Sequence, residues 1–173
     1  MSFSPVPRYS FRAVTDVEPG FLSGLGVRFL MLDLDNTLAT YEEDEPSGSI
    51  SSWVREIEAS GVMLLILSNS RREGRVKAFS ESLGINFKKA ARKPSPKSVR
   101  AAMDEAGYGA EKSALIGDQA FTDALAANRA GVISIAVRPR SLRNPLLAAR
   151  YALEAPFRAF SRRQKGNDHE QNR

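Results

Sequence analysis

The sequence predicts an α/β fold in which a parallel sheet of five strands is flanked by helices. Short apolar runs alternate along the chain with segments in which apolar residues recur at helical spacing, and glycine or proline separates most of them. Strands that are joined through helices run parallel, with right-handed crossovers and with helices on both faces of the sheet.

Five apolar runs are the predicted strands. All are short, and most are rich in Val, Ile and Leu, as expected of parallel strands buried on both faces. Arg28 alone interrupts the first run. The predicted strands are 27–32, 62–67, 85–87, 113–116 and 132–137.

Each helix predicted between these strands is followed by glycine, which commonly ends a helix. Ser51 and Ser52 can cap the first of them, because a serine hydroxyl accepts a hydrogen bond from a free N–H of the first turn. The predicted helices and their terminal glycines are 51–60 with Gly61, 71–83 with Gly84, 95–106 with Gly107 and 124–130 with Gly131.

Residues 1–26 are predicted to form an arm over a core domain of residues 27–137. Three prolines interrupt the arm and disfavour regular structure up to a short helix that begins near Pro19. Its aromatic residues could pin it to the core: Phe3, Tyr9 and Phe11.

Residues 138–173 form a basic tail that holds nine of the 25 Lys and Arg residues and three of the 20 Asp and Glu, which leaves sixteen basic and seventeen acidic residues elsewhere. Asn144 and Pro145 predict a helix start, Pro156 predicts a break, and the chain is expected to be disordered from Arg162 onward. The apolar residues of the tail either close the core or rest with the arginines on an anionic surface.

The composition excludes several kinds of site. The chain has no cysteine, which rules out disulfides, thiolate zinc ligands and cysteine nucleophiles. The single histidine, His169, lies in a polar terminal segment, so a Ser-His-Asp triad or a histidine-bound metal is not expected. No apolar stretch reaches the roughly 18 residues of a transmembrane helix, and a secretory signal is not evident. We therefore expect a cytoplasmic protein, with peripheral membrane contact left open.

Two aspartates one residue apart, Asp33 and Asp35, follow the first predicted strand. They stand at its carboxyl end, where open α/β sheets place their ligands. Two close carboxylates repel each other in a partly dry pocket, and a divalent metal ion or a retained proton relieves that repulsion. The pair indicates a metal site or a general acid; the alternative is a turn in which Asp35 or Asn36 caps the next segment.

Other strand ends and turns carry further polar groups: Ser68 and Asn69, Lys93, and Asp118 with Asp123. Taken singly, each can be a turn residue, a surface charge or a helix cap. In a parallel sheet, however, the ends of the strands concerned lie at one edge. A carboxylate pair, a hydroxyl, a cation and further carboxylates are together what metal-assisted phosphoryl transfer to an aspartate requires.

The motifs DLDNTL, SNS, ARKP and GDQ-x-x-TD, in this order across residues 27–137, resemble the four motifs of the haloacid dehalogenase (HAD) superfamily. Their form is most similar to subfamily IIIA, and within it to the YqeG-like branch that includes the phosphatidylglycerophosphate phosphatases of mitochondria and plastids. The resemblance implies a Rossmann-like HAD fold and a Mg²⁺-dependent phosphatase.

The resemblance also implies a role for each motif residue. Asp33 would be the nucleophile that becomes an aspartyl-phosphate, and Asp35 the acid that protonates the leaving alcohol and then activates water. Lys93 would neutralise the phosphate and the Asp33 carboxylate. The remaining implied roles are phosphate binding by Ser68 and Asn69, Mg²⁺ coordination by Asp33, the Asp35 backbone carbonyl and Asp118, and support of that metal site by Asp123 and Thr37.

The segments between the motifs are too short for the cap domain that many HAD enzymes carry. Leu38 to Val62 leaves a loop and one helix, and Ser68 to Lys93 leaves one helix and a short strand. An uncapped site suits a phosphate carried by something large. The basic tail fits a bilayer or a nucleic acid. The resemblance to the YqeG-like branch then implies phosphatidylglycerophosphate as substrate, with contact of residues 138–165 with an anionic membrane. The alternatives are a phosphatase of nucleic-acid ends, phosphoproteins or soluble phosphoesters, and an RNA- or ribosome-associated binding protein.

Overall fold

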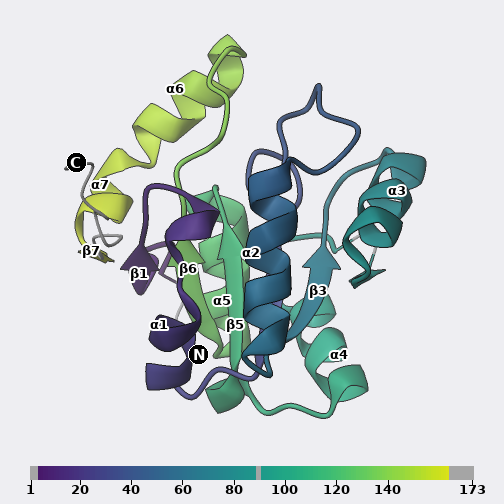
Figure 1. Ribbon diagram of the computed structural model, residues 1–173. Helices are drawn as coiled ribbons and strands as arrows, with labels where there is room; N and C mark the ends of the chain where they lie inside the picture. Colours follow the sequence, from purple (N-terminus) through teal and green to yellow (C-terminus); the bar gives the residue numbers. More distant parts are fainter. Residues whose placement is uncertain (1–3, 89–90, 164–173) are drawn as a thin grey trace, which may run out of the picture.

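A parallel sheet organises the chain (Figure 1). The computed structural model describes residues 4–88 and 91–163, and in it the strand order is β4-β3-β2-β5-β6-β1-β7 with every pair parallel. The strands are β1 (Tyr9–Ser10), β2 (Phe29–Leu32), β3 (Met63–Leu67), β4 (Asn86–Lys88), β5 (Ser113–Gly117), β6 (Ile133–Ala136) and β7 (Arg162–Arg163).

The five predicted strands correspond to β2 through β6, so the predicted fold class is confirmed. The central strand β2 pairs with β3 on one side and β5 on the other, and Leu32 lies opposite Ile66 and Ile116. The three strands therefore end in register. The residues that follow them emerge at the same edge of the sheet, which is the edge where the site is expected.

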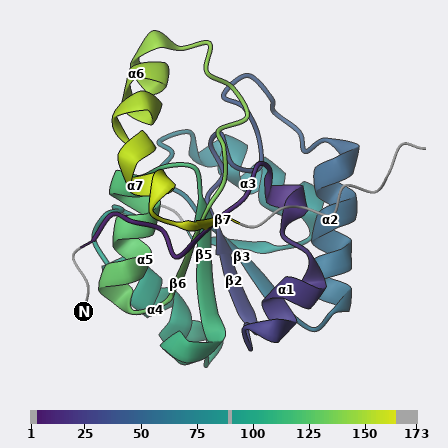
Figure 2. The same ribbon diagram turned by 90° about the vertical axis from the view of Figure 1, so that its left-hand side faces the viewer.

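Helices cover both faces of the sheet (Figures 1 and 2). One apolar cluster joins α1, α2 and α3 to one face, with Trp53 and Phe79 buried in it, and a second cluster joins α4 and α5 to the other face, with Val99 and Met103. Within the described ranges, none of the helices combines the length and the apolarity needed to cross a bilayer. The helices are α1 (Pro19–Gly24), α2 (Gly48–Ala59), α3 (Glu73–Leu83), α4 (Lys97–Ala106), α5 (Leu125–Ala130), α6 (Pro145–Leu153) and α7 (Ala155–Ala159).

The start of α2 differs from the prediction. Ser47 is the N-cap, and its side chain accepts a hydrogen bond from the Ile50 N–H. Ser51, one of the two predicted caps, lies inside the helix and donates its hydroxyl to the Ser47 carbonyl. Sequence reasoning placed the cap too late because three of the four serines between residues 47 and 52 lie inside the helix.

The prediction that the arm has no regular element before its helix was wrong at residues 9–10. The Arg8 and Phe11 N–H groups donate to the carbonyls of Ser134 and Ala136, so the arm joins the sheet as β1 beside β6. Tyr9 and Phe11 are buried and meet Phe21 edge to face, with ring centroids 5.1 and 5.0 Å apart. The prediction for Phe3 lies outside the described residues.

The tail also adds to the sheet. Arg162 and Arg163 pair with β1 as β7, which corrects the prediction of disorder from Arg162 onward; residues 164–173, with His169, lie outside the described residues. The Asn144 side chain caps α6 as predicted, and α6 ends at Leu153, before Pro156. A strand of two residues gives too short a pattern to be predicted from sequence.

Candidate active site at the carboxyl edge of the sheet

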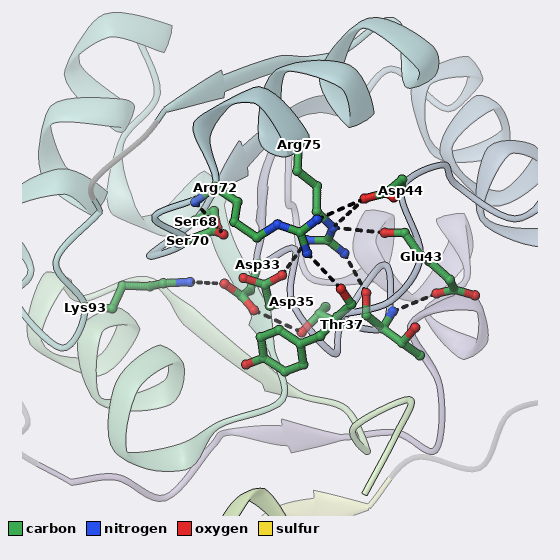
Figure 3. A network of polar contacts seen from close by, with 12 residues as sticks. Asp33, Asp35, Thr37, Glu43, Asp44, Ser68, Ser70, Arg72, Arg75 and Lys93 are labelled. Atoms are coloured by element: carbon green, nitrogen blue, oxygen red, sulfur yellow. Dashed lines mark hydrogen bonds and ion pairs between the residues drawn. The ribbon is translucent and has the colours of Figure 1, made fainter. Parts of the chain in front are cut away.

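Lys93 joins two of the predicted acidic residues at the end of the central strands. Its Nζ lies 2.6 Å from Asp33 Oδ1 (Figure 3) and 2.7 Å from Asp123 Oδ1, and it donates to the Leu67 carbonyl at 2.8 Å. Lys93, Asp33 and Asp123 are all buried. A buried lysine that is held by two carboxylates and a carbonyl is fixed in place, so its charge is directed at Asp33.

Asp118 completes a cluster of three acids with Asp33 and Asp123. One carboxylate oxygen from each residue lies within 4.8 Å of the other two, and all three residues are buried. The close approach of Asp123 requires glycine at position 117, because a Cβ there would lie 2.2 Å from Asp123 Cγ. The glycine of the GDQ motif is thus explained by the carboxylate that packs against it.

The cluster holds more acid than its single lysine neutralises. Burial is the largest cause that raises the pKa of Asp33, which reaches about 7 because the Asp123 carboxylate adds to the effect and Lys93 only partly offsets it. Burial, Asp33 and Asp123 likewise raise the pKa of Asp118. Burial lowers the pKa of Lys93, but the Asp123 and Asp33 carboxylates outweigh that effect and raise it overall, so the lysine stays charged.

These residues fit a hard divalent cation. Asp118 Oδ1 is buried and has no hydrogen-bond partner among the described residues, and carboxylate oxygens are the ligands that Mg²⁺ prefers. Asp123, which was expected to support the metal site, lies in the acid cluster itself. The Asp35 side chain lies outside that cluster; its expected contribution to the metal is the backbone carbonyl.

Arg75 holds the Asp35 carboxylate, and sequence reasoning did not single it out. Arg75 Nη1 lies 2.5 Å from Asp35 Oδ1, while its other nitrogens donate to the carbonyls of Thr40 and Glu43 (Figure 3). The Arg75 side chain is 3% exposed and stacks over Phe79. It therefore ties α3 to the loop after Asp35 and orients that acid. An arginine in the first turn of α3 looks like a surface residue in the sequence, so no pattern marked it.

The turn after Asp35 bends the chain back over the cluster. Asn36 has φ of 62°, a left-handed conformation that asparagine tolerates, and its N–H donates to the Ala39 carbonyl at 2.6 Å. The buried Thr37 hydroxyl lies 3.5 Å from Asp33 Oδ2, the oxygen that Lys93 does not hold. Thr37 is thus placed to orient the Asp33 carboxylate.

Ser68 and Asn69 follow β3 near the acid cluster, but they make different contacts. The Asn69 amide exchanges two hydrogen bonds with the backbone of Lys93, at 2.9 and 3.0 Å, and so fixes the position of the lysine backbone. Ser68 is buried, and its oxygen accepts from the Ser70 N–H. Asn69 and Ser70 line the cleft above the acids, whereas Ser68 is not among the residues that line it.

Glu154, between α6 and α7, reaches the loop that carries Asp118, and sequence reasoning missed it as well. Its side chain is 1% exposed and accepts from the Ala120 and Phe121 N–H groups at 3.0 and 3.2 Å. Arg150 and Arg158 flank it at 3.4 and 3.2 Å. The tail is thereby fastened to the turn between Asp118 and Asp123, a contact between distant segments that leaves no local signal.

The acids open into a cleft of about 430 Å³. Asp33, Asp35 and Lys93 lie in it, and α6 contributes Leu147 and Arg150 to its wall. The exposed arginines at positions 71 and 72 line the cleft as well. The site accordingly combines a lysine-bound carboxylate, a second carboxylate held separately, an acid cluster suited to a metal, and a basic rim. That combination at the end of a parallel sheet defines a hydrolase of the phosphoryl-transfer class.

Comparison with known proteins places the chain within that class. Residues 90–152 match the family model described as HAD-hydrolase-like. The protein named probable phosphatase YqeG from Bacillus subtilis is 35% identical over 134 residues, which cover 78% of this chain and 77% of the relative. The chain therefore belongs to the HAD-like hydrolases, in the YqeG-like group.

Solved structures agree on the fold. The cobalt-bound deoxy-D-mannose-octulosonate 8-phosphate phosphatase YrbI from Haemophilus influenzae has a TM-score of 0.51 at 18% identity, over 65% of this chain and 69% of the other. A 3-deoxy-D-manno-octulosonate 8-phosphate phosphatase from Moraxella catarrhalis, solved with magnesium, phosphate and its sugar, has a TM-score of 0.50 at 12% identity, over 80% and 91% of the two chains. At these identities the likeness shows the shared fold.

Proposed function

We propose that this HAD-like hydrolase is a Mg²⁺-dependent phosphatase that works through an aspartyl-phosphate on Asp33 and converts phosphatidylglycerophosphate to phosphatidylglycerol. Its similarity to a probable phosphatase supports hydrolysis of a phosphomonoester. The observation that carries the mechanism is the Asp33 carboxylate, buried at the end of β2 with Lys93 Nζ at 2.6 Å.

In the first step, an Asp33 oxygen attacks the phosphorus and the bond from phosphorus to the leaving oxygen breaks. Asp35 protonates the departing alcohol, which in the proposed substrate is the glycerol hydroxyl of the headgroup. The Lys93 ammonium offsets negative charge on the transferring phosphoryl group and on the nucleophile. Mg²⁺, held by Asp33, Asp118 and the Asp35 carbonyl when bound, supplies further positive charge at this site.

In the second step, Asp35 takes a proton from water, whose oxygen attacks the phosphorus and releases inorganic phosphate from Asp33. The same acid thus serves twice, as a proton donor and then as a proton acceptor. Arg75 keeps the Asp35 side chain in position, while Thr37 and Asn69 keep Asp33 and Lys93 in place. The net reaction consumes one water and yields an alcohol and phosphate.

The surroundings of the cleft support a lipid substrate. The loop between Asp35 and α2 forms no separate cap domain, and the cleft opens beside α6. On α6, Leu146 and Leu153 are 80% and 71% exposed, and Phe160 after α7 is 80% exposed. Large apolar side chains exposed beside a basic rim fit a phosphate that is presented at an anionic membrane. Contact of residues 138–165 with such a membrane is part of the proposal.

A substrate panel tests this function. Purified protein with Mg²⁺ is given phosphatidylglycerophosphate in mixed micelles, oligonucleotides with terminal phosphates, phosphopeptides and soluble sugar phosphates, with Asp33→Asn protein as the blank. The proposal predicts the highest kcat/KM for the lipid. If kcat/KM is higher for nucleic-acid ends, phosphopeptides or a soluble phosphoester, that compound is the better substrate and the lipid assignment is wrong. No turnover of any substrate, with salt-sensitive RNA binding, would favour an RNA-associated binding protein.

A further inference from the structure

A second hollow lies apart from the catalytic residues, between the N-terminal arm and the tail. Its volume is about 260 Å³, and it is formed by Ser10–Arg12 at the end of β1, Ala136–Arg138 at the end of β6, and residues of α6 and α7. Three arginines line it, and we call it the basic groove: Arg12, Arg138 and Arg158. The figures place α7 next to β1 and β6, at the side of the sheet away from α3 (Figures 1 and 2).

The charge of the basic groove is not balanced by its own lining. None of its described lining residues is acidic, and the Arg12 and Arg138 side chains, both exposed, make no hydrogen bond or ion pair with any residue in the described ranges. Arg158 differs, because Glu154 binds it at 3.2 Å and its guanidinium stacks over the Tyr151 ring. One arginine is thus fixed in place beside two whose charges are available.

Arginine guanidinium groups bind phosphate oxygens in a two-pronged geometry, and three around one hollow favour a phosphate over an isolated carboxylate. The same hollow has apolar lining from Phe11, Tyr151 and Ala155. Beside it, the α6–α7 segment exposes Leu153 and Phe160. Free phosphate would leave these apolar groups unexplained, whereas a phospholipid headgroup with its acyl chains accounts for both.

We propose that the basic groove binds the phosphate headgroup of an anionic phospholipid in a bilayer, at a site separate from the catalytic cleft. The groove and the cleft both lie where parallel strands end. A smaller hollow connects them, because it shares Tyr151 with the groove and Leu147 and Arg150 with the cleft. A lipid bound in the groove would hold the cleft next to the same membrane surface. The groove deepens the proposed function, yet its ligand is a membrane lipid and its residues take no part in catalysis.

The test is binding of the full chain to vesicles of phosphatidylglycerol mixed with phosphatidylcholine, against phosphatidylcholine alone. Arg12→Gln and Arg138→Gln should each weaken partition to the anionic vesicles about fivefold, and the double variant about thirtyfold. Arg28→Gln is the matched control, because Arg28 is an exposed arginine directly before β2, at the end of the strands opposite the groove. It should change partition by less than about twofold. Hydrolysis of para-nitrophenyl phosphate should be unchanged in all four proteins, which shows that they are folded.

A second measurement follows from the absence of cysteine in the chain. Ala159→Cys places a polarity-sensitive fluorophore at the groove, and Glu111→Cys places it at the opposite end of the strands, before β5. Anionic vesicles should shift the emission of the first probe to shorter wavelength, leave the second unchanged, and lose this effect when Arg12 and Arg138 are both replaced by glutamine.

Several results would overturn the proposal. They are absence of vesicle binding by the wild type, equal losses in the groove variants and in Arg28→Gln, or an unshifted probe at position 159. If the groove variants bind vesicles as the wild type does but bind an RNA oligonucleotide more weakly, the groove is a nucleic-acid site instead. Failure of phosphatidylglycerophosphate hydrolysis, with the groove effects intact, would remove the proposed substrate and leave the groove assignment standing.

Discussion

The catalytic cleft and the basic groove lie at the same edge of the sheet, yet they are built in opposite ways. The floor of the cleft is buried. There Lys93 binds the carboxylates of Asp33 and Asp123, which the sequence motifs had already marked as candidate site residues. The groove is built from segments around residues 12, 138 and 158, and two of its arginines are exposed. The charges of the buried cleft therefore affect the stability of the fold, whereas the charges of Arg12 and Arg138 in the groove are available for binding.

Replacing Lys93 should give the largest effect. Lys93→Met leaves the three buried acids without their cation, so turnover should fall about a hundred- to thousandfold, and at pH 8 without metal the free energy of unfolding should fall by about 3–5 kcal/mol. Arg12→Gln in the groove should change stability by less than about 0.5 kcal/mol. Urea unfolding and para-nitrophenyl phosphate kinetics measure both. Equal changes in stability would remove the distinction between the two regions.

Replacing Arg75 should lower kcat more than it raises KM. Arg75→Met frees the Asp35 carboxylate, and a misplaced acid should cost about a hundredfold in kcat. Arg72→Gln is the matched control, since Arg72 contacts the same loop through the Tyr41 carbonyl and Asp44 but does not contact Asp35. Similar kcat values for the two variants would show that Arg75 acts on the loop alone.

The metal-free protein should lose stability as the pH rises. The pKa of Asp33 is raised from 3.8 to about 7 in the folded state, so between these values the native protein binds more protons than the unfolded chain, and its stability falls from about pH 4 to about pH 7. Asp33→Asn should flatten this slope and raise the metal-free melting temperature at pH 8 by about 5 °C. If the metal-free Asp33→Asn protein has a lower melting temperature than the wild type at pH 8, the site does not carry an excess of buried negative charge.

Replacing Glu154 should give a smaller effect that links the tail to the acids. Glu154→Gln replaces one of the two oxygens that accept the Ala120 and Phe121 N–H groups, at a cost of about 1–2 kcal/mol in stability, and should raise the Mg²⁺ concentration for half-maximal activity several-fold. Glu105→Gln is the control, because Glu105 is 72% exposed and pairs with Lys88 on the surface. An unchanged Mg²⁺ dependence would make Glu154 a structural anchor only.

The sequence predicted the parts of this molecule whose partners are local or are set by the sheet. The five central strands were visible as buried apolar runs, and Asp33, Lys93 and Asp118 were expected at one edge because parallel strands end there. The ion pair of Asp35 with Arg75 and the hydrogen bonds of Glu154 could not be predicted. Each depends on how a loop or the tail packs back against the sheet. Arg75 lies 40 residues along the chain from Asp35, and Glu154 lies 34 and 33 residues from Ala120 and Phe121.

The basic tail shows the same limit. The distribution of charge along the sequence places the excess of basic residues in residues 138–173, but it does not show that Arg12 lies with Arg138 and Arg158. Nor does it show which apolar residues of the tail are packed and which are exposed. Phe157 packs edge to face on Phe121, with ring centroids 5.1 Å apart, while Leu146 and Leu153 are exposed. Such partition depends on the docking of α6 and α7.

The central claim is that Asp33 carries the phosphoryl group, and trapping it is the most direct test. Asp35→Asn retains an oxygen that can accept from Arg75 but cannot activate water, while para-nitrophenolate leaves with little acid assistance. Mixing this variant with para-nitrophenyl phosphate and Mg²⁺ should give a burst of one nitrophenolate per chain and an intact mass increased by one phosphoryl group, which peptide mapping places on Asp33. The absence of an adduct, or its location on another residue, would contradict the mechanism.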